Sequence, residues 1–221
     1  MPTSGQSPIG AVILAAGRST RMQALGTPKL LLPLGGRPLI TYAVAAACAS
    51  RVDPLIVVLG NAAERAQTAL NEWAASATPA ILAGRYHCVV NPDFAQGMAS
   101  SLRVGITTLV SIAPDTMGVV ILLADQPLVT TALLDSLLAE AYATPEAIVA
   151  ASYGGQRGHP IYFPRALFDE LMAVTGDEGG RSVVAHHADR LRLIPIVETR
   201  ASLDIDRPED YAAITAICNG V

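Results

Sequence analysis

The chain has 221 residues and a formal net charge of −4 at pH 7. This acidic balance argues against a nucleic-acid partner, because binding a phosphate backbone calls for a basic face. No apolar run is long enough to cross a bilayer, and the first residues lack the basic-then-apolar layout of a signal peptide. Three cysteines, widely separated and set in apolar surroundings, indicate reduced thiols. We therefore expect a cytoplasmic protein that acts on neither nucleic acid nor membrane.

The first strong signal is an apolar strand over residues 11–14 that ends in the small residues Ala15-Ala16-Gly17. Small residues let a ligand approach the backbone closely, and the loop that follows carries Arg18, Arg21 and Lys29, a set of cations suited to a triphosphate. Lys29 is the only lysine of the chain. A compact ammonium suits a phosphoryl oxygen, although a solvated loop lysine is the alternative. In either case we expect an exposed side chain whose loss leaves the fold intact.

Strands and helices then alternate. The pattern predicts helices over residues 38–49 and 61–73, and strands over residues 54–60 and 86–91. This order is typical of a parallel sheet with helices on both faces. We expect a single domain over residues 9–221, preceded by a disordered tail at residues 1–8 that is rich in Pro, Ser and Gly.

A turn at residues 91–97 leads through Gly97 into a helix that runs to about Val110. Ser100 and Ser101 fall in its first turn, where they can meet a ligand or simply cap the helix. Residues 118–124 form the most apolar strand, and Asp125 follows at once. A carboxylate at the carboxyl end of a buried parallel strand is placed to bind a metal ion, but it can equally begin a turn.

The second half of the chain predicts a helix over residues 130–142, a strand over 147–152, a glycine-rich hairpin over 154–163 and a helix over 165–174. Another glycine-rich loop, residues 176–181, leads into a short helix. We interpret His186 and His187 as structural, since adjacent helical residues point about 100° apart. A strand is expected over residues 191–197 and a last helix over 211–218.

Asp204 and Asp206 alternate around Ile205 shortly before this last helix. In an extended segment both carboxylates face one way while Ile205 packs inward. Two carboxylates on one side suit a divalent cation with oxygen ligands. The alternative is an exposed edge followed by an ordinary helix start.

These residues resemble the sugar-phosphate and cofactor nucleotidyltransferases, in particular the MobA-like branch that contains molybdenum cofactor cytidylyltransferase. The resemblance runs from Val12 to Asp210 through five motifs in the expected order, which are residues 14–22 with 28–31, 96–101, 125–127, 157–160 and 204–210. It implies a three-layer α/β/α Rossmann-like nucleotidyltransferase fold with a mainly parallel mixed sheet. It also implies an enzyme that moves a nucleoside monophosphate from a nucleoside triphosphate to a phosphorylated acceptor and releases pyrophosphate.

The resemblance assigns site residues by position. It implies a catalytic role for Arg21, Lys29 and Asp125, and Mg²⁺ held by Asp125 and Asp204, with Asp206 as a weaker ligand of the same ion. The implied nucleotide-binding residues are Leu14, Ala15, Ala16, Gly17, Arg18, Arg21, Lys29, Gly60, Ser100 and Ser101.

The acceptor needs positive charge beyond that committed to the triphosphate. We expect Arg157, His159 and Arg181 to supply it, because they are three potential cations in loops otherwise built of glycine. The alternative is that Arg181 pairs with Asp177 or Glu178 and that His159 bonds to backbone.

The resemblance favours molybdopterin as acceptor, with a molybdenum enzyme as recipient of the product. It also favours CTP over GTP, since Ala16 adds a Cβ where a purine edge would approach. A nucleotide-binding accessory protein without turnover, and a transferase that uses GTP or another acceptor, remain open.

Overall fold

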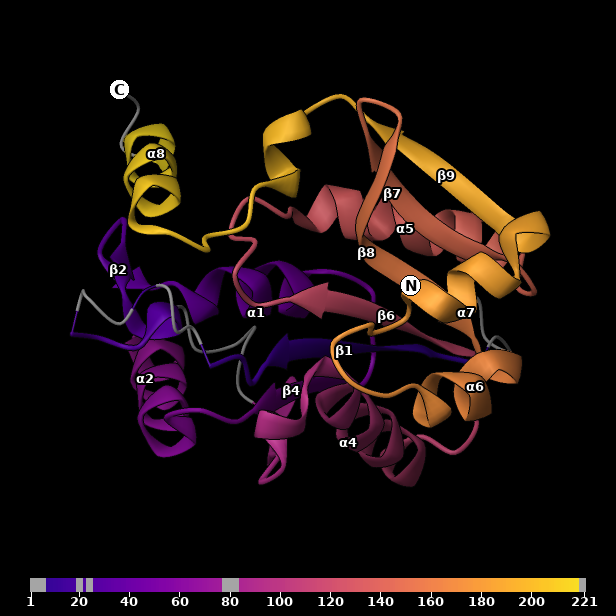
Figure 1. The fold of residues 1–221 in the computed structure, drawn as a ribbon, viewed down its shortest axis with the longest axis horizontal. Helices are drawn as coiled ribbons and strands as arrows, with labels where there is room; N and C mark the ends of the chain where they lie inside the picture. Colours follow the sequence, from indigo (N-terminus) through magenta and orange to yellow (C-terminus); the bar gives the residue numbers. More distant parts are fainter. Residues whose placement is uncertain (1–6, 19–21, 23–25, 77–83, 219–221) are drawn as a thin grey trace.

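The computed structural model describes residues 7–18, 22, 26–76 and 84–218, in which a seven-stranded sheet lies between two layers of helices (Figure 1). The predicted tail at residues 1–8 falls mostly outside this part of the chain. The strands are β1 (Ile9–Ala15), β4 (Leu55–Leu59), β5 (Tyr86–Val90), β6 (Gly118–Leu123), β7 (Ile148–Tyr153), β8 (Gln156–Pro164) and β9 (Leu191–Ile196).

The strand order is β5, β4, β1, β6, β8, β7, β9. Strand β8 runs antiparallel to both of its neighbours, whereas the other pairs in this sheet are parallel. The predicted three-layer fold with a mainly parallel mixed sheet is therefore confirmed. Strand β8 is the antiparallel return of the predicted hairpin.

Helices cover both faces of the sheet and make two apolar cores. One face carries α1 (Ile40–Ala49), α2 (Ala63–Ser76) and α5 (Thr131–Ala143), and the other carries α4 (Met98–Ile112), α6 (Phe168–Ala173) and α7 (Arg181–His186). Along β1, Ile13 faces the first core and Val12 the second, as strand alternation requires. Strand β4 is buried along its whole length because both of its faces are covered.

A third, smaller core joins the end of the chain to its beginning. Helix α8 (Pro208–Cys218) packs through Ile214 near the small antiparallel pair β2 (Pro33–Leu34) and β3 (Arg37–Pro38), as Figure 1 shows. Ile205 belongs to the same core and is fully buried. The C-terminal segment is thereby held beside the loops that follow β1.

The predicted elements agree with the observed ones within three residues at most ends. The largest difference lies at residues 165–174, where a 3-10 turn, Arg165–Leu167, precedes the short helix α6. Within the described residues, none of the helices combines the length and the apolar composition that crossing a bilayer requires.

Parallel pairing brings three chain segments to one edge of the sheet. Ala15 of β1 pairs with Leu59 of β4, and Leu14 pairs with Leu123 of β6, so the loops after these strands leave the sheet side by side. Ligands of open α/β sheets bind outside this carboxyl edge. The β7–β8 register shifts between Ala150 and Ala151, which leaves residues 159–160 as a bulge that turns toward the same edge.

Candidate active site

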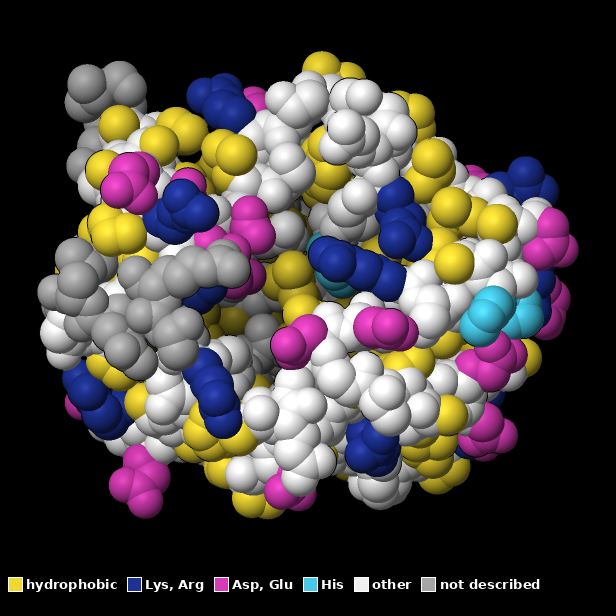
Figure 2. Space-filling view, viewed as in Figure 1, with side chains coloured by type: hydrophobic (Ala, Val, Ile, Leu, Met, Phe, Trp, Pro, Cys, Tyr) yellow, Lys and Arg dark blue, Asp and Glu magenta, His cyan; other side chains and the backbone are white. Residues whose placement is uncertain are grey.

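A cavity of about 860 Å³ opens at the carboxyl edge of the parallel strands. Figure 2 shows the hollow near the middle of one face, with basic side chains on one side and acidic side chains on others. Many of the site residues expected from the sequence line it, namely Leu14, Ala15, Ala16, Gly17, Arg18, Lys29, Ser101, Asp125, Arg157, His159, Arg181, Asp204 and Asp206. Arg21 lies outside the described residues, so its expected role stays a prediction.

Lys29 lies in the 3-10 turn Lys29–Leu31 and points into the molecule. The residue is only 8% exposed, and its Nζ lies 2.7 Å from Asp125 Oδ2 and 3.2 Å from Asp206 Oδ1. Burial by itself lowers the pKa of Lys29, but the charges and hydrogen bonds of the two carboxylates outweigh it and raise the pKa. The expectation of an exposed loop lysine is therefore wrong, because two carboxylates compensate for the lost water.

Asp125 is tied to the C-terminal segment through its backbone. Its carbonyl oxygen accepts a hydrogen bond of 3.1 Å from the N–H of Ile205, and the buried Ile205 side chain anchors that segment, as the sequence predicts. Asp204 and Asp206 therefore lie close to Asp125. Burial raises the pKa of Asp204, and the negative charges of Asp125 and Asp206 raise it further.

The carboxylates fit a hard divalent cation that shares its coordination with a substrate. Among the described residues, no group of three His, Cys, Asp or Glu side chains is placed to hold a metal ion by itself. Asp125 and Asp206, however, both reach the one ammonium of Lys29. Mg²⁺ usually binds one or two carboxylates and completes its octahedron with phosphate oxygens and water. Asp206 is therefore the carboxylate that shares the Lys29 ammonium with Asp125, whereas the resemblance made Asp206 a weaker metal ligand than Asp204.

The small residues after β1 form the floor of the cavity. Ala16 is 5% exposed, and Gly17 has no other side chain or backbone within 4 Å of the place where a Cβ would stand. Gly60 does not line the cavity. A Cβ on Gly60 would lie 2.7 Å from the Cβ atoms of Ala16 and Phe94, so this glycine allows the Ala16 and Phe94 loops to pack together, and its expected contact with a nucleotide stays a prediction.

The two serines of α4 have different surroundings. Ser100 does not line the cavity, and its hydroxyl is held by Asn91 and by the carbonyl oxygens of Asp93 and Gly97. Ser101 does line the cavity. Among the described residues, the Ser100 hydroxyl neither caps α4 through a backbone N–H nor lines the cavity, because its hydrogen-bonding capacity is used by Asn91 and by carbonyl oxygens of the turn.

Arg157, His159 and Arg181 converge on the opposite side of the cavity. Within the described residues, neither guanidinium has a carboxylate at ion-pair distance, so the alternative in which Arg181 pairs with Asp177 or Glu178 is wrong. Burial lowers the pKa of Arg157, and the charge of Arg181 lowers it further. Two guanidinium groups without a carboxylate make this side a place for an anion.

His159 is not the third cation that the sequence predicts. Burial lowers the pKa of His159 from its ordinary value of 6.5 to about 4, and the charges of Arg157 and Arg181 contribute to the decrease. The imidazole is therefore neutral at pH 7. It can give or take a single hydrogen bond at this wall of the cavity.

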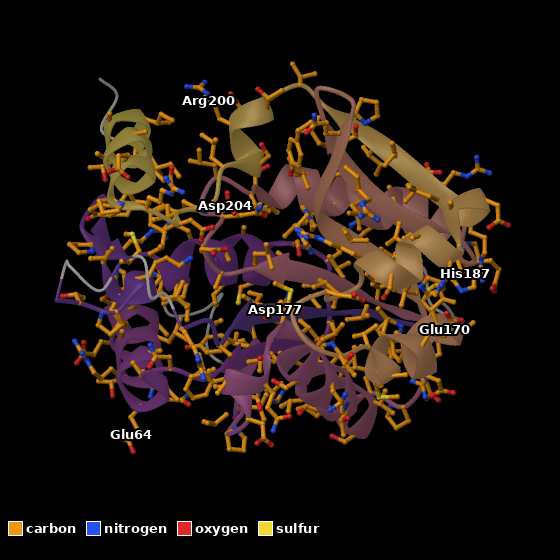
Figure 3. The ribbon with its side chains drawn as sticks, viewed as in Figure 1. Glu64, Glu170, Asp177, His187, Arg200 and Asp204 are labelled. Carbon is orange, nitrogen blue, oxygen red and sulfur yellow. The ribbon has the colours of Figure 1, made fainter. Side chains whose placement is uncertain are left out.

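Two lining residues were missed by sequence reasoning. Asp177 Oδ1 accepts a hydrogen bond of 3.1 Å from the N–H of Met98, at the start of α4. Figure 3 shows Asp177 and Asp204 near the middle of the face, away from the ion pair of His187 and Glu170. Gln126 Oε1 is buried and has no partner within the described residues. The glycines around Asp177 were a signal for the first, and the motif at residues 125–127 was a signal for Gln126, although no role was assigned to its side chain.

Comparison with known proteins finds relatives that are similar over nearly the whole chain. Purine catabolism protein PucB of Bacillus subtilis (strain 168) is 35% identical over 206 residues, which cover 90% of this chain and 92% of PucB. The crystal structure of Rv0371c from Mycobacterium tuberculosis H37Rv has a TM-score of 0.75 and 31% identity, covering 95% of this chain and 97% of that one. A structure of the same protein in complex with manganese has a TM-score of 0.70, 29% identity, and coverage of 95% and 98%.

A nucleotidyl transferase from Methanothermobacter thermautotroptrophicus, Mth528, has a TM-score of 0.78 at 22% identity, covers 97% of this chain and 99% of its own, and shows the shared fold. The family model described as the MobA-like NTP transferase domain matches residues 11–191. A divalent metal is typical of this family. The chain belongs to the MobA-like NTP transferase family.

Proposed function

We propose that the protein transfers CMP from CTP to a phosphorylated acceptor, with molybdopterin as the favoured acceptor, and releases pyrophosphate. The observation that carries this proposal is the division of one cavity into two charged sides. Lys29 with its carboxylates lies beside the small-residue loop after β1, whereas Arg157 of β8 and Arg181 of α7, which have no carboxylate partner among the described residues, lie beyond β6 in the sheet order. Two phosphorylated substrates can therefore be held in one cavity.

The proposed reaction does not require a nucleophilic side chain of the protein. An oxygen of the acceptor phosphate forms a bond to the α-phosphorus of the nucleotide, the bond from that phosphorus to the bridging oxygen breaks, and its electron pair leaves on pyrophosphate. The attacking phosphate is already ionised at neutral pH, so positioning and charge stabilisation dominate. Lys29, with Arg18 and Arg21, supplies positive charge to the triphosphate and the leaving group.

The carboxylates supply the remaining part of the nucleotide site. Asp125 and Asp206, with Asp204 beside them, would hold Mg²⁺ together with phosphate oxygens of the nucleotide. Bound there, the ion would neutralise charge on the phosphates and orient them. The manganese complex of Rv0371c supports a divalent cation in a relative of this chain.

The residues that line the cavity support the proposed choice of base and of acceptor. Ala16 lines the cavity after β1, and its methyl group, which a glycine would lack, would leave less room for a purine than for a pyrimidine near the backbone. Arg157 and Arg181 suit the terminal phosphate of the acceptor, since guanidinium groups clasp phosphate oxygens through paired hydrogen bonds. A molybdenum enzyme would receive the product. Because PucB is named for purine catabolism, an enzyme of purine breakdown is our candidate recipient.

The test is pyrophosphate release, measured with each of the four nucleoside triphosphates and with or without molybdopterin. We expect release from CTP that depends on both the acceptor and Mg²⁺, with a dinucleotide product identified by mass. A protein that binds CTP in calorimetry but releases no pyrophosphate with the acceptor would instead be a nucleotide-binding accessory protein. Release that is fastest with GTP would overturn the choice of base.

A further inference from the structure

Asn91 is a buried polar residue next to the cavity that the proposed chemistry does not use. It follows β5 directly, is 1% exposed, and its backbone N–H donates to the carbonyl oxygen of Leu59 at 2.7 Å. The side chain lies beneath the first turn of α4. A buried amide in this position has to satisfy both its carbonyl oxygen and its NH₂ group.

The hydrogen bonds fix which way this amide points. The backbone N–H of Asp93 donates to the Oδ1 of Asn91 at 2.9 Å. Because a backbone N–H can only donate, the atom that it faces has to be the oxygen, and the NH₂ group has to face the other way. There, Nδ2 donates to the hydroxyl oxygens of Ser100 at 2.8 Å and Ser101 at 2.9 Å.

Each serine hydroxyl therefore receives one hydrogen bond and has one hydrogen left to give. Ser100 gives its hydrogen within the turn, where the carbonyl oxygens of Gly97 and Asp93 lie at 2.8 Å and 3.0 Å. Ser101 has no such acceptor within the described residues, although it is only 4% exposed. Its hydroxyl lines the cavity, so the cavity is where its hydrogen can find an acceptor.

The neighbours of Ser101 indicate which part of a nucleotide lies there. Met98 and Leu102 of the same helix, with Ile121 of β6, line the cavity close to it and are apolar. The carboxylate of Asp177 also lines the cavity, and its Oδ1 accepts from the N–H of Met98. Apolar walls, one hydroxyl donor and a nearby negative charge suit a flat, uncharged ring better than a phosphate group.

We propose that Asn91 is a positioning residue that makes the Ser101 hydroxyl a hydrogen-bond donor toward the nucleoside, where it meets a carbonyl oxygen or ring nitrogen of the base. The inference rests on the proposed nucleotide binding and adds the group that recognises the nucleoside. By accepting from Asn91, the Ser101 hydroxyl keeps its hydrogen for the ligand. The amide acts through the serine and does not touch the ligand itself.

The sharpest variant is Asn91→Asp, because it keeps the size of the side chain and changes one atom from donor to acceptor. A carboxylate oxygen facing Ser101 would take its hydrogen and turn the hydroxyl away from the cavity. We expect the KM for CTP to rise about tenfold while kcat changes less than about threefold, and Ser101→Ala to have the same effect. The double variant should be no worse than Ser101→Ala, since both changes remove one interaction.

Ser100→Ala is the matched control. It removes a hydroxyl that accepts from the same Asn91 atom but faces the turn, so we expect a lower Tm with the KM for CTP unchanged. If Asn91→Asp does not give a cooperative melting transition, Asn91→Ala replaces it, with the same expected lack of additivity with Ser101→Ala.

Independent, additive effects of Asn91 and Ser101 on KM, or a KM that Asn91→Asp leaves unchanged, would overturn the inference. Calorimetric titration of CTP into the wild-type protein distinguishes a failure of this inference from a failure of the proposed function. If the wild type binds CTP without transferring CMP, the transfer proposal fails, and the same variants still test the inference through Kd.

Discussion

The two sides of the cavity differ in how their charges are balanced. On one side the single Lys29 ammonium lies between the two carboxylates of Asp125 and Asp206, so negative groups outnumber positive ones. On the other side Arg157 and Arg181 face the cavity without a carboxylate at ion-pair distance among the described residues. A cluster with an excess of carboxylates can take in a phosphate only together with a further cation, whereas two guanidinium groups without a carboxylate attract an anion directly.

The two sides also differ in the structure that supports them. Asp125 follows the buried strand β6 and Lys29 lies in a 3-10 turn, and both form hydrogen bonds with the segment anchored by Ile205. Arg157 and Arg181 are exposed residues of a hairpin and of a glycine-rich loop. Changes on the Lys29 side should therefore affect both stability and catalysis, and changes on the arginine side should affect one substrate only.

The largest effect is expected from Lys29→Ala. We expect kcat to fall by about 100-fold or more, because the phosphates lose a charge partner in the transition state. We also expect a lower Tm, since two carboxylates would be left without their cation in a partly buried site. Arg65→Ala, which removes an exposed cation of α2, is the control for loss of charge. Unchanged turnover in Lys29→Ala would contradict the assignment of this side to the triphosphate.

Asp125→Asn should weaken the binding of the divalent cation. The change keeps the size of the side chain and removes the charge that a divalent cation needs, so we expect Mg²⁺-dependent transfer to fall by about 100-fold. Electron paramagnetic resonance of Mn²⁺ with CTP present gives a readout independent of turnover. Equal Mn²⁺ affinity in variant and wild type would mean that Asp125 is not a ligand.

Ala16→Gly should change the choice of base. Removing one methyl group from the wall near the backbone is expected to improve kcat/KM for GTP relative to CTP by about tenfold. Competition between the two nucleotides in one reaction measures the ratio. A ratio that stays the same would show that base choice lies elsewhere in the cavity.

The smallest effect is a pH dependence of stability from His159. Its pKa is lowered to about 4, so between its ordinary value of 6.5 and about 4 the unfolded chain takes up a proton that the folded protein resists. Stability should fall as the pH drops through this window. His159→Asn should lose less stability over the same window, and Tm curves of variant and wild type that stay parallel would contradict this.

Much of the fold could be predicted because strands and helices are encoded locally. The apolar run of β6 and the carboxylate after it were enough to place Asp125 at the edge of the sheet. The burial of Lys29 was not predictable in the same way, since its partners lie 96 and 177 residues further along the chain. A local pattern indicates that a loop is polar, but not which distant carboxylates will surround it.

The different surroundings of Ser100 and Ser101 also could not be predicted from the sequence, although their hydrogen-bond partners lie nearby in the chain. Their place in the first turn of α4 follows from Gly97, but the sequence gives no reason to separate Ser100 from Ser101. The Asn91 amide donates to both hydroxyls, and what separates them is that Ser100 donates to carbonyl oxygens of the turn whereas Ser101 lines the cavity. The histidine prediction failed for a related reason, because burial, followed by the charges of Arg157 and Arg181, lowers the pKa of His159, and neither its burial nor the nearness of Arg181 in α7 follows from the local sequence.

The central claim is that the two sides of the cavity bind two different substrates, and Arg181→Ala tests it most directly. KM is measured for CTP and for the acceptor in the variant and the wild type, with Arg65→Ala as control. We predict that KM for the acceptor rises by about tenfold or more, since a charged hydrogen bond to phosphate is lost, while KM for CTP changes by less than about twofold. An equal rise in both KM values, or no rise in either, would contradict the division of the cavity.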